Sequence, residues 1–151
     1  MRLKETVKAL ALNGTLAALY VSLSLISPFS FGVLNFRVSD TIQVVGCMDK
    51  RLRAGIAIGM IVTNLFSPYG LIDVFAATII CAVAFYLGWY IRHEIARVAL
   101  LVLTVALVVA AEIAYVESIP FIWMLLSMIV SETCMSILGY TAIKALQRRK
   151  R

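Results

Sequence analysis

Residues 35–73 read NFRVSDTIQVVGCMDKRLRAGIAIGMIVTNLFSPYGLID. This stretch contains an arginine, two aspartates and an asparagine at positions that a chain in lipid would not tolerate without a reason: Arg37, Asp40, Asp73 and Asn64. A charged side chain at the centre of a bilayer costs about 2.5–3.5 kcal/mol on insertion scales. If the chain lies in a membrane, these side chains are therefore expected to face a protein interior or a wet cavity.

The composition places the chain in a membrane. Of its 151 residues, 62% are hydrophobic and 15% are charged, and the mean hydropathy is +0.97. Soluble domains are about a quarter charged, and a chain of this size cannot hide so much apolar surface inside itself. We expect a single all-α transmembrane domain, residues 1–151, with the lipid bilayer as its solvent.

The net charge of +6 does not indicate nucleic acid. The basic residues flank the apolar runs, which is the pattern of a topology signal. The basic tail from Lys144 to Arg151 is expected to contact anionic lipid headgroups.

Four apolar runs have the roughly 20 residues that are needed to cross the hydrocarbon core. A fifth run, 54–66, is shorter but can be extended through Arg51 and Leu52, and residues 38–48 are too short to cross alone. The short segment could be a half-helix, provided that its backbone ends are covered by protein or line a cavity. The four long runs are Val7–Ile26, Leu71–Ile91, Ile95–Val116 and Ile119–Ala142.

Charge decides how many passes to expect. If the short segment counts as a crossing, there are six passes, and 13 of the 14 Lys and Arg residues lie on one side with Arg37 alone opposite. With five passes, the basic residues near the N-terminus part from the other eleven. The positive-inside bias favours six passes in a multi-pass cell-membrane protein, with both termini cytoplasmic.

That topology gathers the unusual polar groups in the outer half of the membrane. Glu112 lies about 9 Å inward from the turn at Ser118, at 1.5 Å per residue, and Glu132 lies near the centre of the last helix. Four carboxylates then face one guanidinium, that of Arg37. An excess of carboxylates in a dry pocket requires a cation, hydrogen-bond donors or shifted pKa values. We expect a small ligand that is rich in N–H donors and cationic.

Each of these residues also has a purely structural interpretation. Arg37 and Asp40 are three residues apart and could form an ion pair within one helical turn. Asp73 falls in the first turn of its helix, where the dipole favours an anion. Asn64 could join helices through hydrogen bonds. Glu112 and Glu132 have no basic neighbour in the sequence, so a structural role explains them less well.

Aromatic and small residues complete the list of candidates. Phe36, Tyr69 and Trp123 could stack on a flat ring, or they could belong to an interfacial aromatic belt. Gly55 and Gly59 form a GxxxG step that permits close packing of helices within the bundle. A second pair, Gly14 and Ala18, could instead dock a partner membrane subunit. Ser118 is expected to cap the last helix.

Catalysis has little support in this sequence. It contains no apparent Ser/His/Asp set, no metal-ligand spacing and no phosphate-binding glycine loop. Cys47, Cys81 and Cys134 are far apart and are expected to act as packing residues. We expect no enzyme activity, no metal and no cofactor.

The polar residues carry a resemblance to a known family. The runs Phe36-Arg37-Val38-Ser39-Asp40 and Asn64-Leu65-x-Ser67-Pro68-x-Gly70-x-x-Asp73 resemble two signatures of the QueT family of substrate-binding (S) subunits of energy-coupling factor (ECF) transporters. Similar features are Ala18-Leu19-Tyr20-Val21, Pro28-x-Ser30-Phe31-Gly32 and Glu132 with Gly139. Asp40 stands where the family has Glu. Glu112 lies in a helix that lacks the family's usual Pro and Asn.

The resemblance implies a six-helix S subunit that binds a queuosine precursor, such as queuine or 7-aminomethyl-7-deazaguanine. It also implies association with a transmembrane coupling subunit and two cytoplasmic ATPases. The ligand contacts would be Asp40, Asn64, Asp73 and Glu132, with Glu112 as a further candidate and Arg37 orienting Asp40. The alternatives are an S subunit for another vitamin-like or cationic molecule, a stand-alone proton-coupled carrier with Glu132 as its proton site, and a membrane scaffold without transport activity.

Overall fold

The computed structural model describes residues 2–26 and 37–149, and within them the regular structure is entirely helical. The short helix expected at 38–48 is present. A second short helix covers most of the expected run 54–66. The elements are α1 (Arg2–Ile26), α2 (Asp40–Met48), α3 (Arg53–Asn64), α4 (Leu71–Ile80), the π-helix η1 (Cys81–Leu87), the 3₁₀-helix η2 (Gly88–Tyr90), α5 (Glu94–Glu117) and α6 (Phe121–Arg149).

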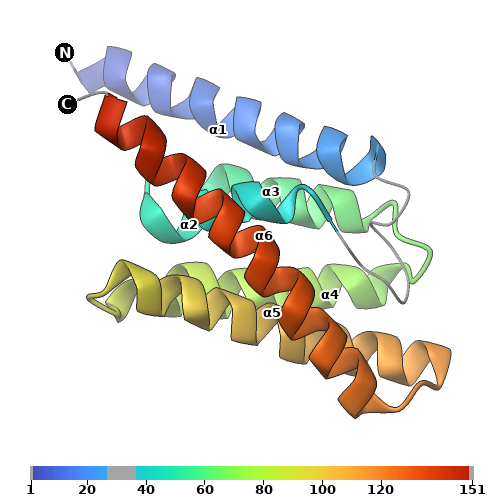
Figure 1. The fold of residues 1–151 in the computed structure, drawn as a ribbon. Helices are drawn as coiled ribbons and strands as arrows, with labels where there is room; N and C mark the ends of the chain where they lie inside the picture. The colour runs from blue at the N-terminus through green and yellow to red at the C-terminus, as the bar shows by residue number, and fades with distance from the viewer. Residues whose placement is uncertain (1, 27–36, 150–151) are drawn as a thin grey trace.

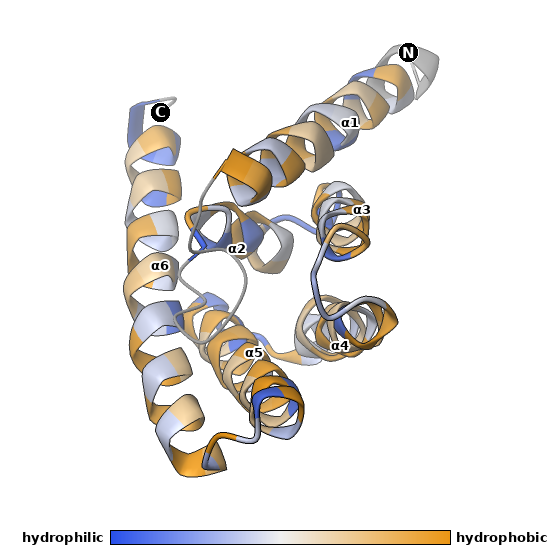
Figure 2. Cartoon of the chain, turned by 90° about the vertical axis from the view of Figure 1, so that its right-hand side faces the viewer, coloured by the Kyte–Doolittle hydropathy of each residue, from blue (hydrophilic) through white to orange (hydrophobic). Residues whose placement is uncertain are grey.

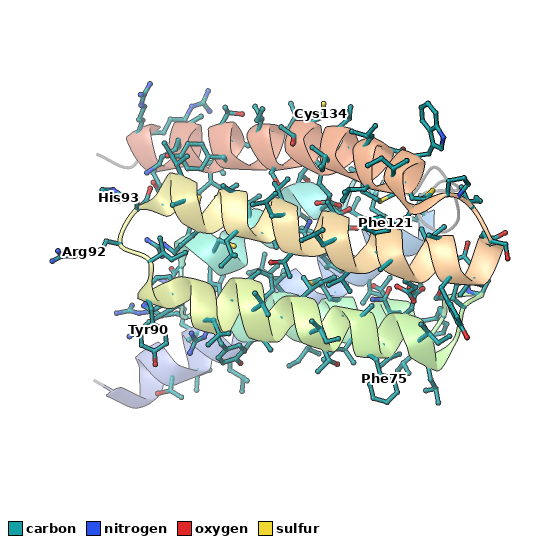
Figure 3. The ribbon with its side chains drawn as sticks, turned by 90° about the horizontal axis from the view of Figure 1, so that it is seen from below. Phe75, Tyr90, Arg92, His93, Phe121 and Cys134 are labelled. Carbon is teal, nitrogen blue, oxygen red and sulfur yellow. The ribbon has the colours of Figure 1, made fainter. Side chains whose placement is uncertain are left out.

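Four of the described helical segments are long and apolar enough to cross a membrane, and they confirm the four long runs expected from the sequence. α1 begins and α6 ends at one end of the bundle, together with the turns at 49–52 and 91–93 (Figure 1). Arg92 and His93 lie at that end in Figure 3. We call it the basic end. The turns at 65–70 and 118–120 lie at the opposite end. The spans are Thr6–Ile26, Leu71–Tyr90, Glu94–Glu117 and Phe121–Arg149.

The outward faces of the long helices are apolar. Hydrophobic residues continue onto the sides of the helices that face away from their neighbours (Figure 2). Phe75 is 71% exposed and points away from the bundle (Figure 3). Large apolar side chains exposed all around a bundle match lipid rather than water, so the chain is a membrane protein.

The short helix α2 lies inside the bundle, where it packs against α1, α3, α5 and α6. α6 approaches it closely at Gly139, where a Cβ atom would lie 2.1 Å from the backbone oxygen of Thr41. At its other end, the Arg97 side chain donates a 2.9 Å hydrogen bond from Nη1 to the backbone oxygen of Cys47. Protein therefore covers a helix that is too short to cross a bilayer, as its exposed backbone requires.

Close contact between α1 and α3 depends on the GxxxG step. A Cβ atom at Gly55 would lie 2.4 Å from the Asn13 backbone oxygen, and one at Gly59 would lie 3.0 Å from the Tyr20 Cβ. The Asn13 side chain accepts a 2.6 Å hydrogen bond from the Gly55 N–H and donates one of 2.8 Å to the Arg51 backbone oxygen. Packing within the bundle is confirmed for this step. Gly14 lies on an exposed face, where an added Cβ atom would meet nothing within 4 Å.

Two local features differ from the expectation. Ser118 does not cap the last helix: it ends α5 in the left-handed region, with φ 54°, and α6 begins only after Pro120. The run from Leu71 is not one regular helix, because it continues beyond Ile80 as a π-helix. The Phe85 ring fills the space beside Gly46, and the Arg53 Nη1 donates a 3.4 Å hydrogen bond to the Phe85 backbone oxygen. These two contacts are non-local, so a local pattern could not reveal them.

Candidate functional site

Side chains from the six α-helices enclose one cavity in the bundle. It lies toward the end opposite the basic end, because its polar residues come from the start of α2, the end of α3 and the first turn of α4. The lining residues are Tyr20, Arg37, Asp40, Gln43, Met60, Asn64, Asp73, Ala76, Ala77, Ile80, Val105, Val109 and Glu132.

Two of the buried carboxyl groups, those of Asp40 and Glu132, lie beside each other. Asp40 is 4% exposed and Glu132 is 2% exposed, and the two groups interact directly. Each also accepts a neutral hydrogen bond: the Tyr20 hydroxyl donates to Asp40 Oδ1 at 3.1 Å, and Gln43 Nε2 donates to Glu132 Oε2 at 2.9 Å. α1, α2 and α6 thus meet at one carboxyl pair.

Asn64 connects three parts of the chain. Its Oδ1 accepts a 3.1 Å hydrogen bond from Arg37 Nη1, and its Nδ2 donates one of 3.3 Å to the Asp73 backbone oxygen. The residue at the end of α3 therefore fixes the approach to α2 and the first turn of α4. This is the interhelical role that the sequence allowed, and it leaves Asn64 on the cavity wall.

A second pair of carboxyl groups consists of Asp73 and Glu112. Asp73 is 4% exposed and Glu112 is 7% exposed. The Asp73 carboxyl group acts directly on that of Glu112, although neither oxygen of Glu112 has a hydrogen bond that meets the usual distance and angle limits among the described residues. Asp73 Oδ2 and both carboxyl oxygens of Glu112 are buried and have no hydrogen-bond partner among the described residues. Asp73 lies in the first turn of α4, where the helix dipole favours an anion, as the sequence predicted.

The charges of the site are unbalanced. The site holds four buried carboxyl groups, and the charge of Arg37 acts on three of them, those of Asp40, Glu112 and Glu132. A carboxylate that loses water must find donors or a positive charge. The arrangement can therefore accept several N–H groups at once.

Tyr69 lies in the turn above the second pair. Its hydroxyl donates a 3.0 Å hydrogen bond to Glu117 Oε1. Partial burial, that hydrogen bond, and the negative charges of Glu117, Asp73 and Glu112 raise the pKa of Tyr69 to about 12. Tyr69 is thus an un-ionised phenol at neutral pH and remains a hydrogen-bond donor beside the acidic groups.

The structure brings together most of the candidate site residues. Arg37, Asp40, Asn64, Asp73 and Glu132 line the one cavity. Glu112 does not line it but contacts Asp73.

The aromatic candidates are not brought to the cavity. Tyr69 and Trp123 do not line it, and Trp123 is 68% exposed. An exposed aromatic ring near a helix end is the arrangement of an interfacial belt. Phe36 lies outside the described residues.

Two polar lining residues, Tyr20 and Gln43, were not predicted from the sequence. Gln43 lies three residues after Asp40, one turn along the same short helix, and an amide in an apolar run is the signal that could have found it. Tyr20 belongs to the Ala-Leu-Tyr-Val stretch, but only the fold reveals that its hydroxyl meets Asp40.

The cavity is small. Its volume is about 20 Å³, which is room for about one water molecule, whereas pockets for small molecules are commonly about 300–1,000 Å³. A bicyclic base fits only if the surrounding helices or side chains move apart.

A larger hollow of about 510 Å³ lies between α5 and α6. No charged side chain lines it, so it does not suit a donor-rich ligand. Its lining residues are Ile95, Val98, Ala99, Val102, Leu103, Ile129, Thr133, Ser136, Ile137 and Tyr140.

A comparison with protein families shows to which family the chain belongs. The family model described as QueT transporter matches residues 10–148, nearly the whole chain. The chain belongs to the QueT transporter family. It is accordingly a transport protein and not an enzyme. No curated protein and no solved structure matches the chain.

Membership extends over every helix that contributes to the cavity. The matched residues include Tyr20 at one extreme of the site and Glu132 at the other. In this QueT-family chain, no group of three or more His, Cys, Asp or Glu side chains within the described residues is placed to hold a metal ion. The four acids of the site are arranged as two pairs.

Proposed function

We propose that this QueT-family protein is the substrate-binding subunit of an ECF-type importer and that it captures a queuosine precursor from outside the cell. Queuine and 7-aminomethyl-7-deazaguanine are the candidate ligands. The observation that carries the proposal is that Arg37, Asp40, Asn64, Asp73 and Glu132 line a single cavity although they lie up to 95 positions apart in the sequence (132 − 37).

The ligand chemistry follows from the donors and acceptors of this cavity. The guanine-like edge of a deazapurine offers a ring N–H and an amino group side by side, and one carboxylate can accept both. Asp40 or Glu132 would fill that role, because both are buried on the cavity wall. Asn64 would complement the ring carbonyl through its amide. Arg37 would orient Asp40 by its charge.

Binding requires the cavity to grow from about 20 Å³. The polar network offers a physical reason for this to occur on ligand entry. Tyr20 and Arg37 donate to groups that the ligand would also approach, so ligand N–H groups can replace these internal hydrogen bonds. Exchanging one hydrogen bond for another has a small net cost.

The proposed topology has six passes in the cell membrane, with both termini and the basic end in the cytoplasm. The site then opens toward the outside. Gly14 and Ala18, which lie on an exposed face of α1, would dock the coupling subunit, because small residues allow close approach of helices in a membrane. Two cytoplasmic ATPases would supply the energy.

A stand-alone proton-coupled carrier is a second candidate, and the buried carboxyl groups of Asp40 and Glu132 favour it. Uptake of radiolabelled 7-aminomethyl-7-deazaguanine into cells separates the two. The proposed S subunit supports uptake only when the coupling subunit and ATPases are coexpressed, and uptake survives a protonophore while ATP is maintained. Uptake by the chain alone that a protonophore abolishes would overturn the ECF assignment in favour of the carrier.

A further inference from the structure

We infer that the Asp73–Glu112 pair is a subsite for an ammonium group, and that it selects amine-bearing deazapurines over neutral ones. This inference rests on the proposed function. It assigns a specificity role to Glu112, which lies on α5 beside Asp73.

The Asp73–Glu112 pair lacks hydrogen-bond donors from the described part of the protein. Among the described residues, Asp73 Oδ2 and both oxygens of Glu112 lack a hydrogen-bond partner, although both side chains are more than nine-tenths buried. Leaving a buried acceptor unpaired is costly, and more so for a charged group. A primary ammonium has three donors, which equals the number of unpartnered oxygens, and its charge is opposite in sign to that of a carboxylate.

The other carboxyl pair, Asp40 and Glu132, differs because it has hydrogen-bond donors from the protein. Asp40 accepts from Tyr20, and Glu132 accepts from Gln43. That pair already has neutral donors in the protein and suits the neutral edge of a base. Of the two pairs, the Asp73–Glu112 pair is the one with three oxygens that lack a donor among the described residues.

The position of Glu112 on α5 also supports the inference. Val105, Val109 and Glu112 follow the spacing i, i+4, i+7, so they share one face of α5. Both valines line the cavity. Glu112 therefore lies on α5 about one turn beyond the cavity-lining Val109, and there it meets Asp73, a cavity-lining residue of α4. The charges of both carboxyl groups contribute to the raised pKa of the Tyr69 phenol.

The negative charge of the Asp73–Glu112 pair could instead be compensated by Arg37 or by a proton that the two carboxyl groups share. The guanidinium charge acts on Glu112, and Arg37 Nη1 donates a 3.1 Å hydrogen bond to Asn64. If the two carboxyl groups instead share a proton, the pair is neutral and has no preference for a cation. The two possibilities differ in ligand selectivity, which can be measured.

The test compares two ligands with the same ring. Purified protein in detergent is titrated with 7-aminomethyl-7-deazaguanine and with 7-cyano-7-deazaguanine, whose nitrile is neutral. A charge-assisted hydrogen bond of about 1.5–3 kcal/mol corresponds to about 10–100-fold in affinity. We expect the amine to bind at least about tenfold more tightly, and Glu112→Gln to remove most of that preference by weakening amine binding alone.

Glu94→Gln is the matched control. It makes the same change on the same helix at the basic end, where Glu94 pairs with Lys144 on the surface. An exposed pair of this kind contributes little to stability and lies away from the cavity, so the selectivity should be unchanged.

The results test the ammonium subsite and the proposed ligand separately. Equal affinity of wild-type protein for amine and nitrile overturns the ammonium subsite while leaving the deazapurine assignment intact. Binding of neither compound overturns the proposed ligand itself. If Glu112→Gln does not fold, the wild-type comparison of the two ligands still decides the question.

Discussion

At the scale of single residues, the site depends on which acids have protein donors. Asp40 and Glu132 are each held by a neutral side chain, whereas Asp73 and Glu112 are not. Sequence alone could identify all four as acids that are costly to place in lipid. It could not pair them, because pairing depends on which helix faces meet.

Gln43 provides a direct test of this division. Gln43→Leu removes the 2.9 Å hydrogen bond to Glu132 and leaves a buried acid without its donor, at a cost of about 1–3 kcal/mol. We predict that affinity for 7-aminomethyl-7-deazaguanine falls by about tenfold, measured by calorimetric titration.

Thr141→Val is the control for that change, because Thr141 is exposed on α6 and bonds only to its own helix. An affinity of Gln43→Leu equal to that of the control would mean that Gln43 does not position Glu132 for the ligand.

At the scale of elements, the hydrophobic runs predicted the four long helices because their length is a local property. The short helix at 40–48 could also be anticipated, since its polar residues and its length exclude a simple crossing. The π-helix at 81–87 and the left-handed Ser118 could not. The π-helix contacts residues far away along the chain, because Phe85 packs beside Gly46 and its backbone oxygen accepts a hydrogen bond from Arg53.

Two glycines on α1 and α3 differ in what surrounds them. Gly55→Ala would place a Cβ atom 2.4 Å from the Asn13 backbone oxygen, whereas Gly14→Ala would meet nothing within 4 Å. Overpacking costs about 1–3 kcal/mol. We predict that Gly55→Ala lowers the melting temperature by about 5 °C or more and that Gly14→Ala leaves it nearly unchanged.

The same contrast tests partner docking. Gly14→Leu should preserve ligand binding by the isolated chain but reduce copurification of the coupling subunit. Copurification at the wild-type level would argue against a docking role for the face of α1 that carries Gly14.

At the scale of the whole molecule, the distribution of charge relates the fold to the membrane. The turns at 49–52 and 91–93 lie at the end where α6 finishes its basic last turn. On the positive-inside rule we propose that this end lies in the cytoplasm. The cavity residues then lie toward the outside.

Labelling with a membrane-impermeant maleimide in intact cells tests this orientation. In a background that lacks the exposed Cys134, Ser118→Cys should react from outside and His93→Cys should react only after the cells are opened. The reverse pattern would place the site on the cytoplasmic side.

The central claim is that buried acids from several helices jointly bind one small molecule. The most direct measurement is thermal stabilisation of the purified protein by a panel of deazapurines and vitamins. We predict that 7-aminomethyl-7-deazaguanine raises the melting temperature of the wild type and that the increase is lost in Asp73→Asn and in Glu132→Gln. A melting temperature that no compound in the panel changes, or an increase that both variants retain, would contradict the claim.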